Sequence, residues 1–237
     1  MRTDPLKADQ LLRTLERAAR HHGPASLSSS LSAEDMVITD AILRHGLDIG
    51  IFAIDTGRLH ADTLDMIEAI ERKYDYAISV YRPDRAAVEA YATRHGNDAF
   101  YDSAELRRQC CHLRKVEPLE RALEGRRGWI TGLREVAGAR EQVPLMQFDE
   151  THGVVKINPL AQWNADDVWA YLREHDVPYN RLYDQGYRSI GCAPCTRPTL
   201  RHEDERAGRW WWETGVVREC GLHVDAGGRV IRIKEVA

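Results

Sequence analysis

The five cysteines are the residues of this chain with the most distinctive chemistry. They form an adjacent pair, Cys110 and Cys111, a Cys-x-x-Cys pair, Cys192 and Cys195, and one solitary residue, Cys220. An odd number grouped in this way differs from the scattered spacing of a disulfide framework in a small secreted protein. Metal binding or thiol chemistry is therefore the better interpretation.

Four of these cysteines are suited to ligate a metal. The adjacent pair and the Cys-x-x-Cys pair offer four thiolates from two segments, which suits either Zn²⁺ or an iron–sulfur cluster. Neighbouring residues of a helix point about 100° apart, so Cys110 and Cys111 would crowd one zinc ion, whereas a cubane offers each thiolate its own iron. We therefore favour a [4Fe-4S] cluster on Cys110, Cys111, Cys192 and Cys195. A Cys192–Cys195 redox disulfide or merely buried thiols would leave the adjacent pair unexplained, and Lys115 follows Cys111 by one helical turn, beside the expected cluster.

The solitary Cys220 has the surroundings of a reactive thiol. A glycine follows it, and His223 supplies an imidazole that can stabilise a thiolate or act as an acid. Upstream, Arg206 and Arg209 precede three tryptophans and are suited to hold an oxyanion. A thiol on a flexible segment can reach a bound ligand in one step and a partner thiol in the next. We therefore predict that residues 207–237 form a mobile tail carrying a nucleophile.

The elements that must position these residues alternate along most of the chain. Apolar runs predict strands over 25–28, 49–54, 77–80, 128–132 and 154–157, and amphipathic patterns predict helices over 33–45, 61–74, 84–95, 103–123 and 164–175. This alternation predicts an α/β fold with a doubly wound, mostly parallel sheet. A helical cap within residues 1–24 precedes the sheet, and a Cys-rich irregular segment follows residue 176. A length of 237 residues suits a single domain.

Polar motifs follow three of the predicted strands. They are Ser28, Ser29 and Ser30, then Asp55, Thr56, Gly57 and Arg58, and finally Gly132 with Arg134. Ligands of open parallel sheets bind at the carboxyl ends of the strands, and a helix N-terminus there favours phosphate or sulfate. Serines also cap helices, so the first motif alone is ambiguous. Together the three motifs predict a nucleotide site.

Composition excludes some classes of partner. A formal net charge of -4 argues against a nucleic-acid surface, because phosphate-backbone binding needs an excess of Lys and Arg. The chain lacks a signal-peptide pattern and any apolar run of the roughly 20 residues that a membrane helix needs. We expect a soluble cytoplasmic protein without membrane contact, which forms a homo-oligomer.

Several motifs resemble those of the adenylylsulfate (APS) and phosphoadenylylsulfate (PAPS) reductase family, in particular its bacterial assimilatory APS reductases. The resemblance runs from about residue 26 to 223 and is carried by Cys110-Cys111 and by the segments 191–198, 208–212 and 219–223. It implies an adenine nucleotide alpha-hydrolase-like fold and an enzyme of sulfate assimilation and cysteine biosynthesis. In such enzymes the counterpart of Cys220 attacks the sulfur of APS and releases AMP. Thioredoxin or a similar dithiol then reduces the S-sulfocysteine to release sulfite, and the cluster is structural and electrostatic.

The resemblance also implies roles for individual residues. It assigns Ser28 to Ser30 and Asp55 to Arg58 to the nucleotide, Gly132 and Arg134 to its pocket, and Lys115, Arg206, Arg209 and His223 to the phosphosulfate group. The chain departs from the family over 135–140, where a second Arg and a Gln-Ser pair are usual.

Three alternatives remain for the function. PAPS is one, although four cluster cysteines accompany APS use in the family. An ATP-pyrophosphatase-like nucleotidyltransferase is another, but residues 28–35 contain neither Gly nor Lys. A Cys₄ zinc module that binds a partner would leave Cys220 unexplained.

Overall fold

The computed structural model describes residues 2–135 and 143–213, which divide into two compact units. Unit 1 comprises the described residues of Met1–Ala53, Thr63–Ser79 and Leu123–Asn180, and unit 2 those of Ile54–Asp62, Val80–Ala122 and Arg181–Ala237. Each unit therefore draws on three separate stretches of the chain. The single domain over 1–237, with boundaries at 24 and 207, stays a prediction.

Six short strands form one mostly parallel sheet. They are β1 (Ala25–Ser29), β2 (Ile49–Ile54), β3 (Ser79–Tyr81), β4 (Gly128–Ile130), β5 (Met146–Asp149) and β6 (Val154–Ile157). Their order across the sheet is β3-β2-β1-β4-β6-β5. β1 pairs in parallel with β2 and β4, β4 pairs in parallel with β6, and β5 runs antiparallel to β6 at the edge. The predicted α/β fold with a mostly parallel sheet is confirmed.

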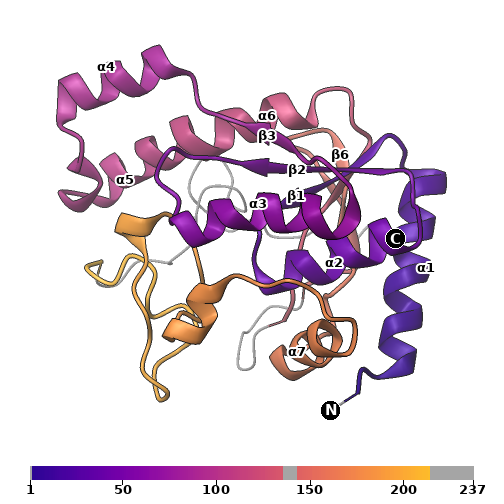
Figure 1. The fold of residues 1–237 in the computed structure, drawn as a ribbon. Helices are drawn as coiled ribbons and strands as arrows, with labels where there is room; N and C mark the ends of the chain where they lie inside the picture. Colours follow the sequence, from indigo (N-terminus) through magenta and orange to yellow (C-terminus); the bar gives the residue numbers. More distant parts are fainter. Residues whose placement is uncertain (1, 136–142, 214–237) are drawn as a thin grey trace. The chain divides into compact units, whose positions relative to one another are not determined.

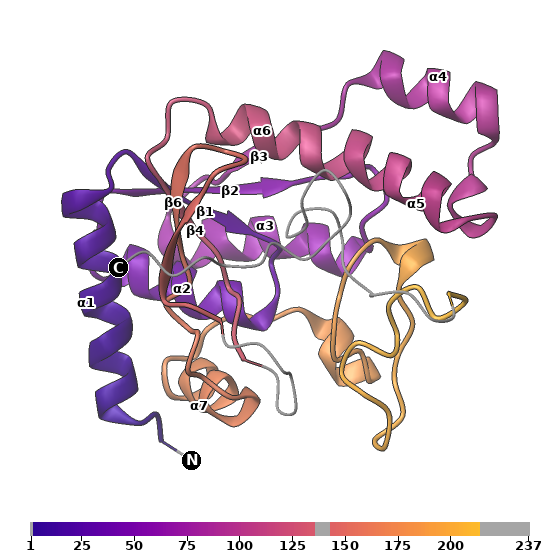
Figure 2. The ribbon, with the colours of Figure 1, turned by 180° about the vertical axis from the view of Figure 1, so that it is seen from behind.

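The helices of unit 1 begin at residues suited to start them. They are α1 (Pro5–His21), α2 (Ala33–Arg44), most of α3 (Ala61–Tyr74) and α7 (Ala165–Glu174). The Asp4 carboxylate accepts a hydrogen bond from the backbone N–H of Leu6, and Asn164 forms a capping box with Asp167. Figures 1 and 2 show α2 and α3 side by side over one face of the sheet.

A buried carboxylate ties three of these helices together. Asp40, on α2, is fully buried and accepts hydrogen bonds from the hydroxyl of Tyr74 at 2.9 Å and that of Tyr171 at 2.8 Å. Arg44, one turn along α2, pairs with the same carboxylate at 3.0 Å. These bonds satisfy a charge that would otherwise be costly to bury. They fix the position of α2, whose N-terminal turn follows the first predicted anion-binding motif.

Unit 2 contains shorter helices and long irregular stretches. Its helices are α4 (Arg85–His95), α5 (Ala104–Cys111), a π-helical turn over His112–Val116, most of α6 (Glu117–Leu123), and 3₁₀ turns at Ala99–Tyr101, Arg181–Gln185 and Ala193–Cys195. The π turn is closed by a hydrogen bond from the backbone N–H of Glu117 to the carbonyl of His112. Residues 181–213 contain no strand longer than an isolated bridge, so the predicted Cys-rich irregular segment is present in the described part of the C-terminal region.

The structure differs from the sequence-based prediction at one edge of the sheet. β5 was not predicted, because it is short and Phe148, its only aromatic residue, is 57% exposed. It forms a hairpin with β6 through a turn in which Gly153 has a φ of +67°, a conformation that favours glycine. Within residues 2–135 and 143–213, no helix combines the length and the apolar character that crossing a bilayer requires.

Candidate functional site

All four predicted ligand cysteines line one cavity of unit 2. The other lining residues are four cations and two aromatic residues: Arg58, Arg107, Arg114, Lys115, Phe100 and Trp210. The four cysteines are free thiols, so the alternative of a Cys192–Cys195 disulfide finds no support. Four thiols and four positively charged side chains therefore line the same cavity.

Helix α5 and the π turn after it supply one side of the cavity. Cys110 and Cys111 are the last residues of α5, and Arg114 and Lys115 lie in the π turn. The wider π turn still brings both cations to the cavity, each four residues after a cysteine. π turns inside helices are frequent at functional sites. The prediction that Lys115 lies beside these thiols agrees with its place in the wall.

The Cys192–Cys195 turn supplies the other two thiols of the cavity. The backbone N–H of Cys195 donates to the carbonyl of Cys192 at 2.9 Å, and Ala193 N–H donates to the carbonyl of Arg58 at 2.8 Å. Gly191 precedes the turn, where a Cβ would overlap the guanidinium of Arg209. A larger residue here would require the Arg209 guanidinium to move away from the turn.

Charge around the cavity affects the individual thiols differently. Burial, with smaller contributions from the neighbouring Cys192, Cys111 and Cys110, raises the pKa of Cys195 to about 12, although Lys115 opposes the rise. Burial also acts to raise the pKa of Cys192, but Lys115 and other nearby cations and donors hold it below its usual value. These mutual effects mean that four thiolates would repel one another. Bound positive charge is what would let all four ionise together.

Two kinds of metal centre are held by four cysteine thiolates in proteins. Within the described ranges, no group of three or more His, Cys, Asp or Glu side chains is arranged to hold one metal ion. A zinc ion needs four sulfur atoms at about 2.3 Å from one point. A cubane gives each thiolate a separate iron, so its ligands stand further apart. Four thiols that line one cavity are chemically suited to either centre.

The predicted nucleotide motif at 55–58 forms part of the wall of the cysteine cavity. The hydroxyl of Thr56 lies 3.3 Å from Cys192 Sγ, and Arg114 Nη1 donates to the carbonyl of Thr56 at 2.7 Å. Arg58 lines the cavity, donates to Asp98 at 3.1 Å and stacks on Phe100.

The remaining residues of this motif form a tight turn. Asp55 accepts the N–H of Gly57 at 2.9 Å and pairs with Arg82 at 3.1 Å. Gly57 has a φ of +69°, which favours glycine. Contact of this motif with a nucleotide stays a prediction.

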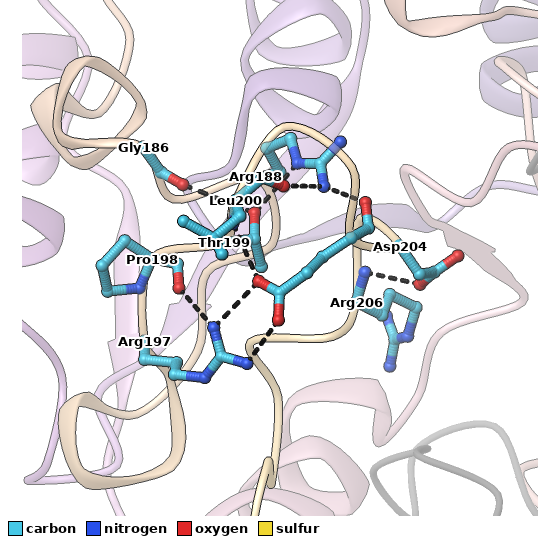
Figure 3. A network of polar contacts seen from close by, with 9 residues as sticks. Gly186, Arg188, Arg197, Pro198, Thr199, Leu200, Asp204 and Arg206 are labelled. Atoms are coloured by element: carbon cyan, nitrogen blue, oxygen red, sulfur yellow. Dashed lines mark hydrogen bonds and ion pairs between the residues drawn. The ribbon is translucent and has the colours of Figure 1, made fainter.

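Arg206 and Arg209 lie on a loop held by its own ion pairs. Arg197 (Figure 3) donates from Nη1 and Nη2 to the carboxylate of Glu203, at 3.0 and 2.8 Å. Arg206 follows a turn in which its N–H donates to Asp204 at 2.8 Å. Arg209 is 6% exposed and donates to the carbonyl of Ile190 at 3.0 Å.

Contacts hold the first residues of the predicted tail. Trp210 is 1% exposed, and its backbone N–H donates to the carbonyl of Cys195 at 3.1 Å. Residues 208–213 are thus anchored beside the cysteine turn, with Trp210 as the anchor. The binding of a phosphosulfate group by Arg206 and Arg209 stays a prediction.

In unit 1, the serine motif is organised by a carboxylate that sequence reasoning did not single out. Asp35 is 4% exposed, and its Oδ2 accepts the N–H of Ser30 at 2.7 Å, its hydroxyl at 2.6 Å and the hydroxyl of Ser32 at 3.3 Å. Burial raises the pKa of Asp35 to about 6, although the bonds from Ser30 oppose the rise. Ser29 accepts the N–H of Leu31 at 3.2 Å. The N–H groups of Ser30 and Leu31 are therefore used inside the loop.

The other predicted residues of unit 1 lie next to this loop. Trp129 Nε1 donates to the hydroxyl of Ser28 at 2.7 Å. A Cβ on Gly132 would overlap Asp35 Oδ1, so glycine is required for the close approach of α2. Arg134 pairs with Glu34 at 2.7 Å. Unit 1 thus brings together Ser28 to Ser30, Gly132 and Arg134 at the start of α2.

Some predicted residues lie outside the described part of the chain. They are Cys220, His223 and the tail after it, and residues 136–140 of the loop that departs from the family. Sequence reasoning in turn missed Arg107, Arg114 and Trp210 as parts of the cysteine cavity. Residues four apart on a helix are neighbours, which is why Lys115 was placed beside Cys111. The same spacing predicts both arginines, since Arg107 precedes Cys111 by four residues and Arg114 follows Cys110 by four.

Comparison with known proteins decides the family. The sequence pattern of the phosphoadenosine phosphosulfate reductase domain matches residues 24–198. The chain belongs to this family. It is 50% identical over 219 residues to the adenosine 5'-phosphosulfate reductase of Burkholderia cepacia, a match that covers 92% of this chain and 88% of that protein.

Solved structures agree with membership of the reductase family. The phosphoadenylyl-sulfate (PAPS) reductase from Candida auris, in a phosphate complex, is similar with a TM-score of 0.68 and 29% identity, over 78% of this chain and 88% of that one. Yeast FAD synthetase in complex with FAD is similar with a TM-score of 0.53 and 14% identity, over 81% of this chain and 67% of that one. The second likeness shows a shared fold alone.

Proposed function

We propose that this reductase converts adenylylsulfate to sulfite and AMP, with thioredoxin or a similar dithiol as the electron donor, in assimilatory sulfate reduction. The observation that carries the proposal is the cavity of unit 2, in which four free cysteines meet four cations. The relative from Burkholderia cepacia, named as an adenosine 5'-phosphosulfate reductase, matches this chain over nearly its whole length. Four cluster cysteines favour APS over PAPS as the substrate.

The proposed reaction has two steps at one sulfur atom. The Cys220 thiolate attacks the sulfur of APS, an S–S bond forms, the S–O bond to the phosphate breaks and AMP leaves. One thiol of a dithiol then attacks Cys220 Sγ, so that sulfite departs with the bonding electron pair and a mixed disulfide forms. The second thiol attacks the first thiol's sulfur in that disulfide, which frees the Cys220 thiolate and leaves the dithiol as a disulfide. His223, three residues away, is proposed to lower the pKa of the thiol or to protonate the leaving group.

The residues proposed to bind the substrate are those that the family resemblance assigns to it. In unit 1, Ser28 and the loop that Asp35 organises, with Gly132 and Arg134 beside it, are suited to an anionic nucleotide at the start of α2. In unit 2, Arg206 and Arg209 are proposed for the sulfate and phosphate oxygens, since guanidinium groups bind them in a bidentate manner. The 55–58 motif is proposed to bind the nucleotide and Lys115 to face the phosphosulfate group; Arg58 and Lys115 both line the cysteine cavity.

We further propose that Cys110, Cys111, Cys192 and Cys195 hold a [4Fe-4S] cluster. When bound, it would supply a fixed charge that lets the four thiols ionise and orders the cations around them. The reducing electrons come from the dithiol. A zinc ion is the competing occupant, and the adjacency of Cys110 and Cys111, which would crowd one ion, counts against it. A cytoplasmic location and a homo-oligomeric state stay predictions.

The proposal is tested by purifying the protein without oxygen and measuring iron, acid-labile sulfide and zinc per chain. Sulfite release is then measured from APS and from PAPS with reduced thioredoxin. We expect iron and sulfide in equal amounts, no zinc, and sulfite from APS far faster than from PAPS. Faster turnover of PAPS would reassign the substrate, and zinc in place of iron would refute the cluster. No sulfite from either substrate would refute the function.

A further inference from the structure

Arg107 borders the cysteine cavity and is held more rigidly than the other cations there. It lies on α5, four residues before Cys111, with a side chain only 2% exposed. Its Nε donates to Glu213 Oε1 at 2.5 Å and its Nη2 donates to Glu213 Oε2 at 3.1 Å. The guanidinium also stacks on Trp210, 4.4 Å from the ring centroid. One edge and one face of this planar group are therefore fixed.

The other edge of the guanidinium still has a donor to satisfy. Arg107 Nη1 is buried and has no hydrogen-bond partner among the described residues. Arg107 lines the cavity and Glu213 does not. The charge of Arg107 also interacts with the thiol of Cys111. Buried donors nearly always have an acceptor, which indicates that a group bound in the cavity accepts a hydrogen bond from Nη1.

The other arginines of the cavity use their terminal nitrogens on protein oxygens. Arg58 donates to Asp98 and to the carbonyl of Asn97, and Arg114 donates to the carbonyl of Thr56. One edge of the Arg107 guanidinium instead donates to the buried carboxylate of Glu213, which neutralises the charge of Arg107 and sets its orientation. Its remaining edge is thus a preorganised donor that needs no movement to meet an acceptor.

We propose that Arg107 is a positioning residue whose Nη1–H donates to a sulfur atom of the cluster held by the four cysteines. The inference rests on the proposed function, because it requires the cluster. Thiolate and sulfide sulfurs of such clusters accept hydrogen bonds from the protein, and these bonds tune the electron density on the sulfurs and irons. The buried pair with Glu213 then acts on the cluster through Arg107, and Glu213 itself touches no ligand.

The test compares three variants of the anaerobically purified protein. Arg107→Lys keeps the charge but has no second edge, and the double variant Arg107→Gln with Glu213→Gln removes both buried charges together. Arg108→Lys is the matched control, because Arg108 is the exposed neighbour that pairs with Glu105 at 3.6 Å. Iron and sulfide per chain are measured for each, and resonance Raman spectra of the Fe–S stretching bands are recorded in H₂O and in D₂O.

We expect the wild type and Arg108→Lys to show the same shift of the Fe–S bands on exchange into D₂O. Both Arg107 variants should lose part of that shift. An unchanged shift in iron-loaded Arg107 variants would overturn the inference.

A crystal structure of the iron-loaded wild type decides the matter even where the variants fail to fold. Nη1 within hydrogen-bond distance of a cluster sulfur supports the proposal, and Nη1 bonded to water or a protein oxygen refutes it. Wild-type protein that holds zinc or no metal would instead refute the proposed cluster, and the function is judged separately by sulfite release.

Discussion

The pH dependence of stability provides a quantitative test of how the serine loop is built. Asp35 is buried and its pKa is raised from 3.8 to about 6. Because the folded-state pKa lies above the unfolded one, this carboxyl opposes folding once it ionises. The penalty is absent below about pH 4, grows as pH rises from 4 to 6 and is complete above 6. A rise of about two pKa units corresponds to about 3 kcal/mol of unfolding free energy.

Asp35→Asn should remove this penalty while keeping the shape of the side chain. The amide oxygen can still accept the bonds from Ser30, and the amide cannot ionise. Urea unfolding of both proteins at pH 4, 5, 6 and 7 gives the free energies. We expect that of the variant to gain about 3 kcal/mol relative to wild type between pH 4 and 7. Asp65→Asn, at an exposed position of α3, should show no such gain, and parallel curves for wild type and Asp35→Asn would refute the reasoning.

Three further changes test the site. Gly132→Ala should lower the unfolding free energy by about 1–3 kcal/mol and raise KM for APS, because the new Cβ overlaps Asp35; an unchanged KM and melting temperature would contradict this. Arg114→Gln removes the hydrogen bond to the carbonyl of Thr56, which belongs to the motif proposed to bind the nucleotide. A charged hydrogen bond contributes about 1.5–3 kcal/mol, so steady-state kinetics should show KM for APS raised by at least about tenfold, with kcat less affected. Cys192→Ser should reduce iron and sulfide to background in the anaerobic assay, and retained iron would exclude Cys192 as a ligand.

Much of the fold was predictable because local patterns agree with the tertiary structure. The apolar run at 49–54 and the periodic pattern at 61–74 coincide with β2 and α3, since both face the core over their length. The edge strand β5 was not predictable in this way. Its pairing with β6 is a long-range property, and its exposed Phe148 breaks the expected burial of an aromatic residue.

The cysteine cavity was predictable in its ligands but less so in its walls. Thiol chemistry and spacing were sufficient to group the four cysteines. The wall residues could not be predicted without knowing which segments are in contact. The 55–58 motif lies against the Cys192 turn through the Leu59–Cys192 bridge, a long-range contact that local sequence patterns do not predict. Asp35 was hidden for a similar reason, because an acidic residue at a helix start is ordinary until its burial is known.

The most direct measurement of the central claim is the mass of the intact protein after mixing with APS in the absence of any dithiol. The account predicts that each chain gains one SO₃ group, that an equal amount of AMP is released, and that added thioredoxin removes the group as sulfite. Cys220→Ser should keep its iron and gain nothing. Release of AMP without an adduct on the wild type, or an adduct that persists in Cys220→Ser, would contradict the assignment of Cys220 as the residue that accepts the sulfonate.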